Sequence, residues 1–145
     1  MKKSIYSSFL ALLVLILVAA CKKETVTPKQ NTPSANSIDG KWNLTRIYGG
    51  IAGVNETHNS GEIEWIFTSS NHTLTVNNTT GSSTYYYLPS GTYNFQQISN
   101  SNQHYLVIDA NELGQFTISG NQMHIDENKK SEGEGACGFY VELER

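Results

Sequence analysis

The chain has 145 residues, is 38% hydrophobic and carries a formal net charge of −3. From position 38 onward (145 − 37 = 108 residues) it has five basic and twelve acidic residues, hence a net charge of −7. This acidic balance argues against nucleic acid and anionic lipid as partners, because both carry negative charge. A segment of that length suits one domain.

The first residues have the pattern of a secretory signal peptide. Lys2 and Lys3 form a short basic segment, and every residue from 9 to 20 is apolar. Such a run is shorter than the roughly 20 residues that a helix needs to span a bilayer. It ends in small residues, as the segment before a cleavage site does. We therefore predict that residues 1–20 are a signal peptide that is removed.

The apolar run ends in Val18-Ala19-Ala20-Cys21, which resembles the lipobox of bacterial lipoproteins. The resemblance implies a diacylglyceryl group on the thiol of Cys21, cleavage before it, and attachment to a membrane of the cell envelope through acyl chains. Each buried CH₂ contributes about 0.8 kcal/mol, so two or three chains anchor firmly. Lys22 follows, which resembles lipoproteins of the Gram-negative outer membrane; whether the domain faces periplasm or exterior stays open. The alternatives are a conventional signal with an incidental cysteine and an uncleaved anchor.

The segment after the cysteine is polar. Residues 22–37 contain two prolines and no aromatic residue, leucine or isoleucine, so they bury too little apolar surface to offset the entropy of ordering. We expect residues 21–37 to form the lipidated cysteine and a flexible tether, and residues 38–145 to form the folded domain. With Cys21 acylated, Cys137 has no partner in the chain, and its place before an apolar strand predicts a small buried hydrophobe.

The domain alternates apolar and polar residues, which is typical of antiparallel strands with one buried face. Turn signals separate these runs: Pro89 and Gly91 suit a type I turn, and Gly120-Asn121 suits a two-residue loop of type II′. The fold class is therefore all-β, an antiparallel meander of about eight or nine strands. Closing it into a small barrel removes the exposed edges. The clearest alternating runs are 62–67, 72–77, 91–98 and 137–144.

The first strand begins Gly40-Lys41-Trp42, and Gly-x-Trp at this place resembles the signature of the lipocalins and calycins. The resemblance implies that Trp42 closes one end of the barrel and that a basic residue of the last strand packs over its ring. Arg145, near the end of the last strand, is the first candidate. Arg46 is the second, because strict alternation puts it on the same face as Trp42.

Aromatic residues are plentiful in the predicted strands. They could line a cavity for a small apolar ligand. The alternative is that the same rings fill the interior, as side chains can in a barrel of about eight strands. The residues of this predicted cavity are Trp65, Phe67, Tyr85, Tyr87, Tyr93, Phe95 and Tyr105.

We find no catalytic constellation, and we expect no enzyme, cofactor or metal. The four histidines show no metal-ligand spacing, so they are expected at the surface. Glu62 and Glu64 are the best candidates for a carboxylate pair that does acid–base chemistry, but their positions are typical of the solvent-exposed face of a strand. The acidic segment 126–135 is expected to be a solvated loop. Two functions stay open: a lipid-anchored carrier of a small apolar ligand, and a filled interaction or structural module that binds an envelope protein.

Overall fold

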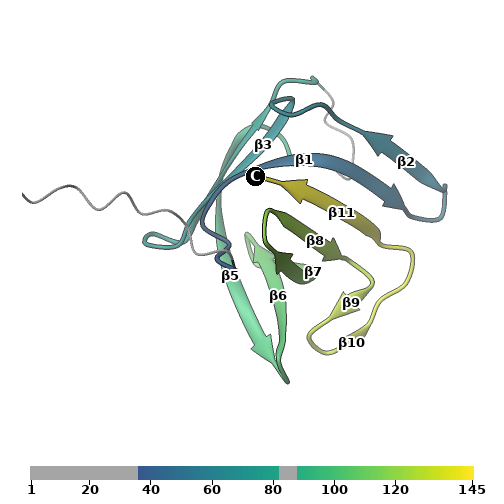
Figure 1. Cartoon of the computed structure of the whole chain (residues 1–145). Helices are drawn as coiled ribbons and strands as arrows, with labels where there is room; N and C mark the ends of the chain where they lie inside the picture. Colours follow the sequence, from purple (N-terminus) through teal and green to yellow (C-terminus); the bar gives the residue numbers. More distant parts are fainter. Residues whose placement is uncertain (1–35, 82–87) are drawn as a thin grey trace, which may run out of the picture. The chain divides into compact units, whose positions relative to one another are not determined.

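The computed structural model describes residues 36–81 and 88–145, and every regular element in these ranges is a strand (Figure 1). The predicted signal peptide, most of the tether, and Tyr85 and Tyr87 lie outside the described residues. The strands are β1 (Gly40–Gly49), β2 (Val54–Thr57), β3 (Ile63–Thr68), β4 (Thr73–Asn78), β5 (Gly91–Asn100), β6 (Gln103–Ile108), β7 (Asn111–Ser119), β8 (Gln122–Asp126), β9 (Lys129–Lys130), β10 (Gly133–Glu134) and β11 (Phe139–Glu144).

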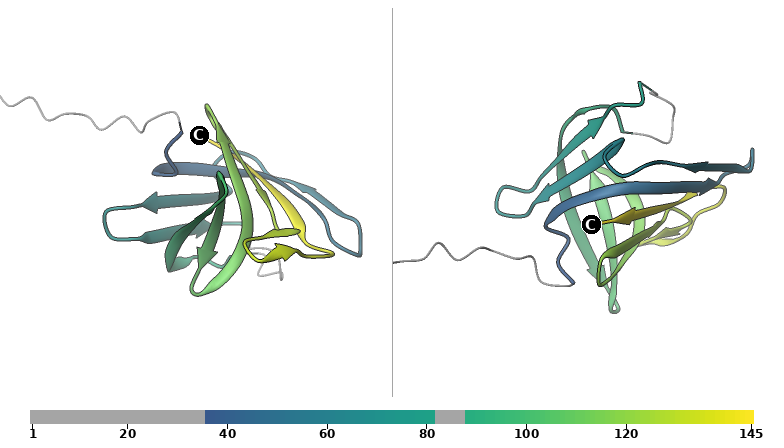
Figure 2. Two further views of the ribbon diagram at one scale, coloured as in Figure 1. Left: turned by 90° about the horizontal axis from the view of Figure 1, so that it is seen from below. Right: turned by 45° about the horizontal axis from the view of Figure 1, so that its top comes forward.

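Eight strands close into an antiparallel barrel, which confirms the predicted fold class. Around the barrel the order is β1, β3, β4, β5, β6, β7, β8 and β11, and β11 pairs again with β1 (Figures 1 and 2). The turn between β7 and β8 has Gly120 at φ +60°, as the predicted type II′ turn requires. Successive strands are neighbours nearly everywhere, so local hairpins build most of the barrel.

Strand β1 is long and contains an irregularity. Its first half pairs with β3 and its second half with β2, while β11 runs along its other side. The register against β11 shifts between Leu44 and Arg46, so Thr45 is an extra residue. The shift changes which residues face inward: Leu44 and Ile47 are both fully buried although they are three positions apart. Arg46 therefore does not lie on the inward face, where strict alternation from Trp42 would place it.

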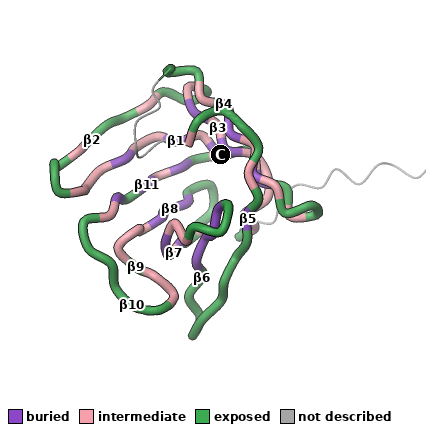
Figure 3. Tube along the Cα trace, turned by 180° about the vertical axis from the view of Figure 1, so that it is seen from behind, coloured by how far each residue is buried: buried purple, intermediate pink, exposed green. Residues whose placement is uncertain are grey.

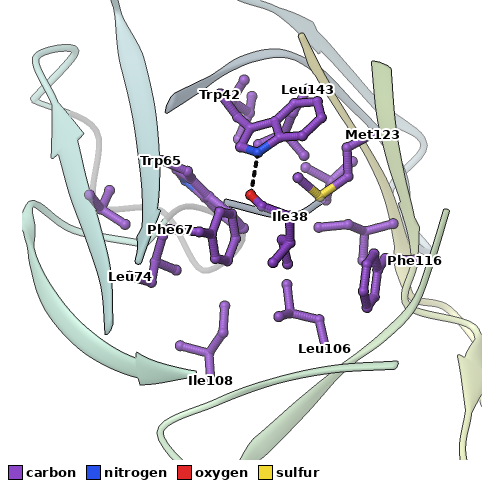
Figure 4. Packing of buried hydrophobic residues seen from close by; sticks show 14 of the residues in the cluster. Ile38, Trp42, Trp65, Phe67, Leu74, Leu106, Ile108, Phe116, Met123 and Leu143 are labelled. Atoms are coloured by element: carbon purple, nitrogen blue, oxygen red, sulfur yellow. Dashed lines mark hydrogen bonds between the residues drawn. The ribbon is translucent and has the colours of Figure 1, made fainter. Parts of the chain in front are cut away.

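The interior of the barrel is apolar. No polar or charged side chain of the described residues is buried. The buried positions lie along the barrel strands (Figure 3). The rings pack edge to face: Phe67 and Phe95 have centroids 5.1 Å apart at 85°. One cluster of 18 buried side chains fills this space (14 of them in Figure 4): Ile38, Trp42, Leu44, Ile47, Ile63, Trp65, Phe67, Leu74, Val76, Phe95, Leu106, Ile108, Phe116, Met123, Ile125, Phe139, Val141 and Leu143.

The acidic segment expected to be a solvated loop forms a hairpin instead, and that expectation is wrong in part. Strands β9 and β10 pair with each other, and β9 packs against β7. Lys130 Nζ donates to the carbonyl oxygens of Glu112 (2.7 Å) and Leu113 (2.9 Å). The Glu112 carboxylate accepts from the amide and the hydroxyl of Ser131, each at 2.6 Å. These polar contacts to the barrel wall hold a segment that has no apolar side chains of its own.

Cys137 is exposed, so the prediction of a buried thiol is wrong. Strand β11 begins only at Phe139, and Cys137 lies in the preceding loop with φ +66°. The alternation of the strand does not extend to this position, and the loop turns the side chain outward.

Candidate functional site

One end of the barrel is closed by Trp42 and by the chain that leads into β1. The Trp42 ring is fully buried, and its Nε1 donates to the carbonyl oxygen of Ile38 at 2.8 Å (Figure 4). The Ile38 side chain is 3% exposed and belongs to the central cluster. Gly40, between them, has φ +109°, a conformation that favours glycine. The entering chain thus turns sharply and leaves Ile38 as a plug.

Arg145 lies over this plug. Its guanidinium carbon is 4.3 Å from the centroid of the Trp42 ring, a cation–π distance. Nη1 donates to the carbonyl oxygens of Ser37 (3.2 Å) and Asp39 (3.3 Å), and Nη2 donates to that of Gly120 (3.2 Å). One side chain therefore joins the entering chain, the first strand and the β7–β8 turn.

Arg46, the second candidate for this role, lies elsewhere. Because of the bulge at Thr45 it points outward, where its guanidinium carbon is 4.4 Å from the centroid of the Tyr48 ring. Its Nε donates to Asn55 Oδ1 at 3.0 Å. The structure brings Arg145 and Trp42 together, and it places Arg46 on the outer wall.

Sequence reasoning missed two residues of the closed end. Asp39 Oδ1 accepts from the backbone amide of Ser69 at 2.6 Å and so ties the entering chain to the β3–β4 turn. Ile38 fills the centre of the barrel end. The available signal was its position: Ile38 is the first large apolar residue after a long polar segment.

The predicted cavity residues are divided between two faces. Trp65, Phe67 and Phe95 lie inside and pack against one another, and Tyr93 is partly buried at the border of the cluster. Tyr105 is buried but lies outside the cluster, on the opposite face of β6 from Leu106 and Ile108. Its inclusion in the cavity set is wrong. It lines a groove on the outside of the barrel together with residues of the β9–β10 hairpin.

One polar atom of the interior has no partner. Among the buried side-chain nitrogen and oxygen atoms of the described residues, Nε1 of Trp65 lacks a hydrogen bond. An unpaired buried donor costs about 1–3 kcal/mol. The indole of Trp42, with its bond to Ile38, carries no such cost. Nε1 of Trp65 could therefore donate a hydrogen bond to an additional molecule inside the barrel, whereas Nε1 of Trp42 already donates to Ile38.

The outer wall of β1, β11, β8 and β7 carries a groove of about 230 Å³. Strand register aligns Tyr48, Tyr140, Asp126 and Gln115 in one row across it. The rings of Tyr48 and Tyr140 stack, with centroids 5.0 Å apart and planes 15° apart. Burial raises the pKa of the Tyr48 hydroxyl, and the Glu142 carboxylate raises it further, so this group stays a hydrogen-bond donor.

A second row lies beside the first on the same wall. It runs through Arg46, Glu142, His124 and Thr117. The acidic groups of both rows have basic neighbours: His124 Nδ1 lies 3.9 Å from Glu142 Oε1, and Lys129 Nζ lies 3.7 Å from Asp126 Oδ2. The lining is thus polar, with one Asp126–Lys129 ion pair, one carboxylate beside a histidine, and one aromatic pair.

Glu62 and Glu64 do not form a carboxylate pair. Asn59 donates to Glu62 through its amide and side chain, and these bonds lower the pKa of Glu62. Lys41 Nζ is 2.7 Å from Glu64 Oε1, and this bond lowers the pKa of Glu64. Both groups are suited to stay ionised, and neither has the raised pKa of a general acid.

Within the described residues, no three histidine, cysteine, aspartate or glutamate side chains gather as a metal site requires. Nor does that part of the chain contain a helix long and apolar enough to cross a bilayer. No family model, curated protein or solved structure matches the chain. The barrel with its closed end is consistent with a lipocalin-like fold.

Proposed function

We propose that this chain is a lipid-anchored protein of the cell envelope whose filled barrel is a non-catalytic module that binds another envelope component. The observation that carries this proposal is the interior: 18 apolar side chains form one cluster, and aromatic rings contact one another at its centre. The grooves of the outer wall, by contrast, have polar side chains. Support for binding therefore comes from the outside of the barrel.

The anchor is proposed from the sequence. Acyl chains on Cys21 would hold the protein in the outer membrane of a Gram-negative bacterium. Sixteen residues would then separate the lipid from Ile38 (37 − 21 = 16). In the described residues, the chain enters the domain at the barrel end that Ile38 and Arg145 close.

The anchor is tested by replacing each cysteine separately. We expect Cys21→Ala to leave the precursor unacylated and to move the protein out of the detergent-soluble membrane fraction. Cys137→Ala is the matched control, because it removes the other thiol, which is exposed. Fractionation and intact-mass spectrometry are the measurements. Acylation of unchanged mass on the Cys21→Ala protein would refute the proposed anchor.

A second candidate function is transport or storage of a small apolar ligand, and the unpaired Nε1 of Trp65 favours it. An amphipathic molecule inside the barrel could accept a hydrogen bond from that donor. The ligand would have to displace part of a packed cluster, which makes this candidate weaker.

Native mass spectrometry of protein from its own host separates the two functions. A filled barrel predicts no co-purified ligand and no saturable binding of an apolar fluorescent probe. A carrier predicts a bound ligand and weaker probe binding in Trp65→Phe, which removes the N–H and keeps an aromatic ring. Trp42→Phe is a poor control because Trp42 holds the closed end; Tyr140→Phe, on the outer wall, is the better one.

A further inference from the structure

The groove on the outer wall adjoins a second one. This second groove, of about 320 Å³, lies between the β5–β6 turn and the β9–β10 hairpin. The two grooves share Gln115 and Lys129. Each is near or below the lower end of ligand pockets, about 300–1,000 Å³. Together they form a longer track, which suits an extended molecule better than a compact one.

The chemistry of the track is polar and hydrogen-bonding. Its second half is lined by amide, hydroxyl and charged side chains, among them Gln103; the Asn100 amide already donates to the Ser131 carbonyl, and the Ser131 hydroxyl to Glu112. Its first half adds Gln115, His124 and the Tyr48–Tyr140 pair. Amides and hydroxyls both donate and accept, so they match ligand hydroxyl groups, which do the same.

Charge limits the ligand further. In the first half of the track, Asp126 lies beside Lys129, and Glu142 lies beside His124. The lysine is matched by the aspartate, so an anionic ligand would find no unmatched positive charge there. The domain's net charge of −7 adds a general repulsion of polyanions. These observations favour a neutral ligand over an anionic one.

Tyr140 supplies the apolar element that such a ligand needs. It is 38% exposed, and the Tyr48 ring stacks against it and limits its motion. Three large hydrophobic side chains of the described residues are strongly exposed (Ile51, Ile98 and Tyr140), and of these Tyr140 alone lines the track. A protein interface would place several such anchors together. One rigid ring among polar groups instead matches a sugar ring, which has an apolar C–H face and a rim of hydroxyls.

We propose that the track formed by these two grooves binds a neutral oligosaccharide, with one sugar ring packed on Tyr140 and its neighbours hydrogen-bonded along Gln115 and the β9–β10 hairpin. This inference rests on the proposed function, since it names the chemical class of the envelope component. It would also restrict that component to a polysaccharide or glycan chain.

The test uses the full acylated protein in a polyoxyethylene detergent, which carries no sugar. Maltohexaose, cellohexaose and N-acetylchitohexaose are titrated while isothermal calorimetry records binding. We expect at least one to bind with a Kd below about 10 mM, and Tyr140→Ala to weaken it about tenfold. Tyr140→Phe should keep affinity within about twofold, because the ring stays. Ile98→Ala is the matched control, with the same exposure but outside the track.

Several outcomes would overturn the proposal. One is no binding of the three hexasaccharides by a protein whose circular dichroism and melting temperature are normal. Another is binding that Tyr140→Ala and Gln115→Ala leave unchanged. A third is capture of one protein partner that Tyr140→Ala abolishes, without saccharide binding. None of these touches the acylation of Cys21 or the filled interior, so failure of this inference is distinguishable from failure of the proposed function.

Discussion

The closed end of the barrel and its outer wall are built by different kinds of contact. At the closed end, Arg145 reaches backbone carbonyls as far back as Ser37, 108 positions away, over a fully buried ring. On the outer wall, Tyr140 and Gln115 are brought together by the register of neighbouring strands, and they stay partly exposed. The difference indicates a division: the closed end contributes stability, and the outer wall is available for recognition.

Replacing Trp42 with alanine should have the largest effect on the free energy of unfolding, because Trp42 belongs to the closed end. Removing a fully buried ring and its hydrogen bond to Ile38 should lower the free energy of unfolding by about 3–5 kcal/mol. Tyr140→Ala, on the outer wall, should lower it by less than about 1 kcal/mol. Urea denaturation of both variants is the measurement. Similar denaturation midpoints for the two would contradict the division.

Gly114→Ala should have the next largest effect, because β7 and β8 meet there without space for a side chain. A Cβ at Gly114 would lie 2.3 Å from the carbonyl oxygen of Asp126. The backbone of Gly114 also has φ +151°, which residues other than glycine rarely adopt. We expect a loss of about 2–3 kcal/mol from overpacking and backbone strain. Gly135→Ala is the control, since its Cβ would lie 3.5 Å from the nearest atom. An unchanged thermal midpoint for Gly114→Ala would refute the observed register.

Arg145→Ala should cost about 1–3 kcal/mol, from the lost cation–π contact and three hydrogen bonds to carbonyls. Arg145→Lys should recover only part of this, because lysine lacks the planar fork that reaches several carbonyls. Arg46→Ala changes an arginine of the outer wall and should lower the free energy of unfolding by less than about 0.5 kcal/mol. If Arg46→Ala proved the more damaging change in urea denaturation, the assignment of the two arginines would be wrong.

The smallest predicted effect concerns Glu127, next to the β9–β10 hairpin. Partial burial raises the pKa of this carboxyl; the hydrogen bond from the Phe139 amide and the nearby Lys130 charge lower it, but by less. As the pH rises above 4.5, the ordinary pKa of a glutamate, Glu127 loses its proton in the unfolded chain before it does so in the folded protein. The free energy of unfolding therefore falls with rising pH until the pH exceeds the pKa of Glu127 in the folded protein. Glu127→Gln should remove this fall and be slightly more stable at pH 7. A steeper loss of stability with rising pH in the variant would contradict it.

The barrel could be predicted from the sequence because the signals that indicate it are local. Alternation, turn residues and Gly-x-Trp each depend on a few neighbouring positions, and Trp42 with Arg145 followed from the resemblance. The extra residue at Thr45 could not be anticipated, since nothing in the sequence around it marks a bulge. That single residue decides whether Arg46 faces Trp42 or the outer wall.

The outer track was hidden for a related reason. Tyr48 and Tyr140 become neighbours only through the register of β1 against β11, which includes the bulge. Tyr105 is buried on the outside of the barrel, beside a hairpin whose polar sequence is typical of a solvated loop. Contacts such as Lys130 with Glu112 join segments whose composition gives no signal of packing.

The indole N–H signals of the two tryptophans offer the most direct test of a filled interior. In a ¹H–¹⁵N correlation spectrum of the full protein, we predict that a long-chain fatty acid leaves both signals unchanged. The hydrogen bond to Ile38 should identify Trp42 by slow exchange with solvent. A saturable shift of the Trp65 signal on adding the fatty acid would contradict the account and establish the barrel as a carrier.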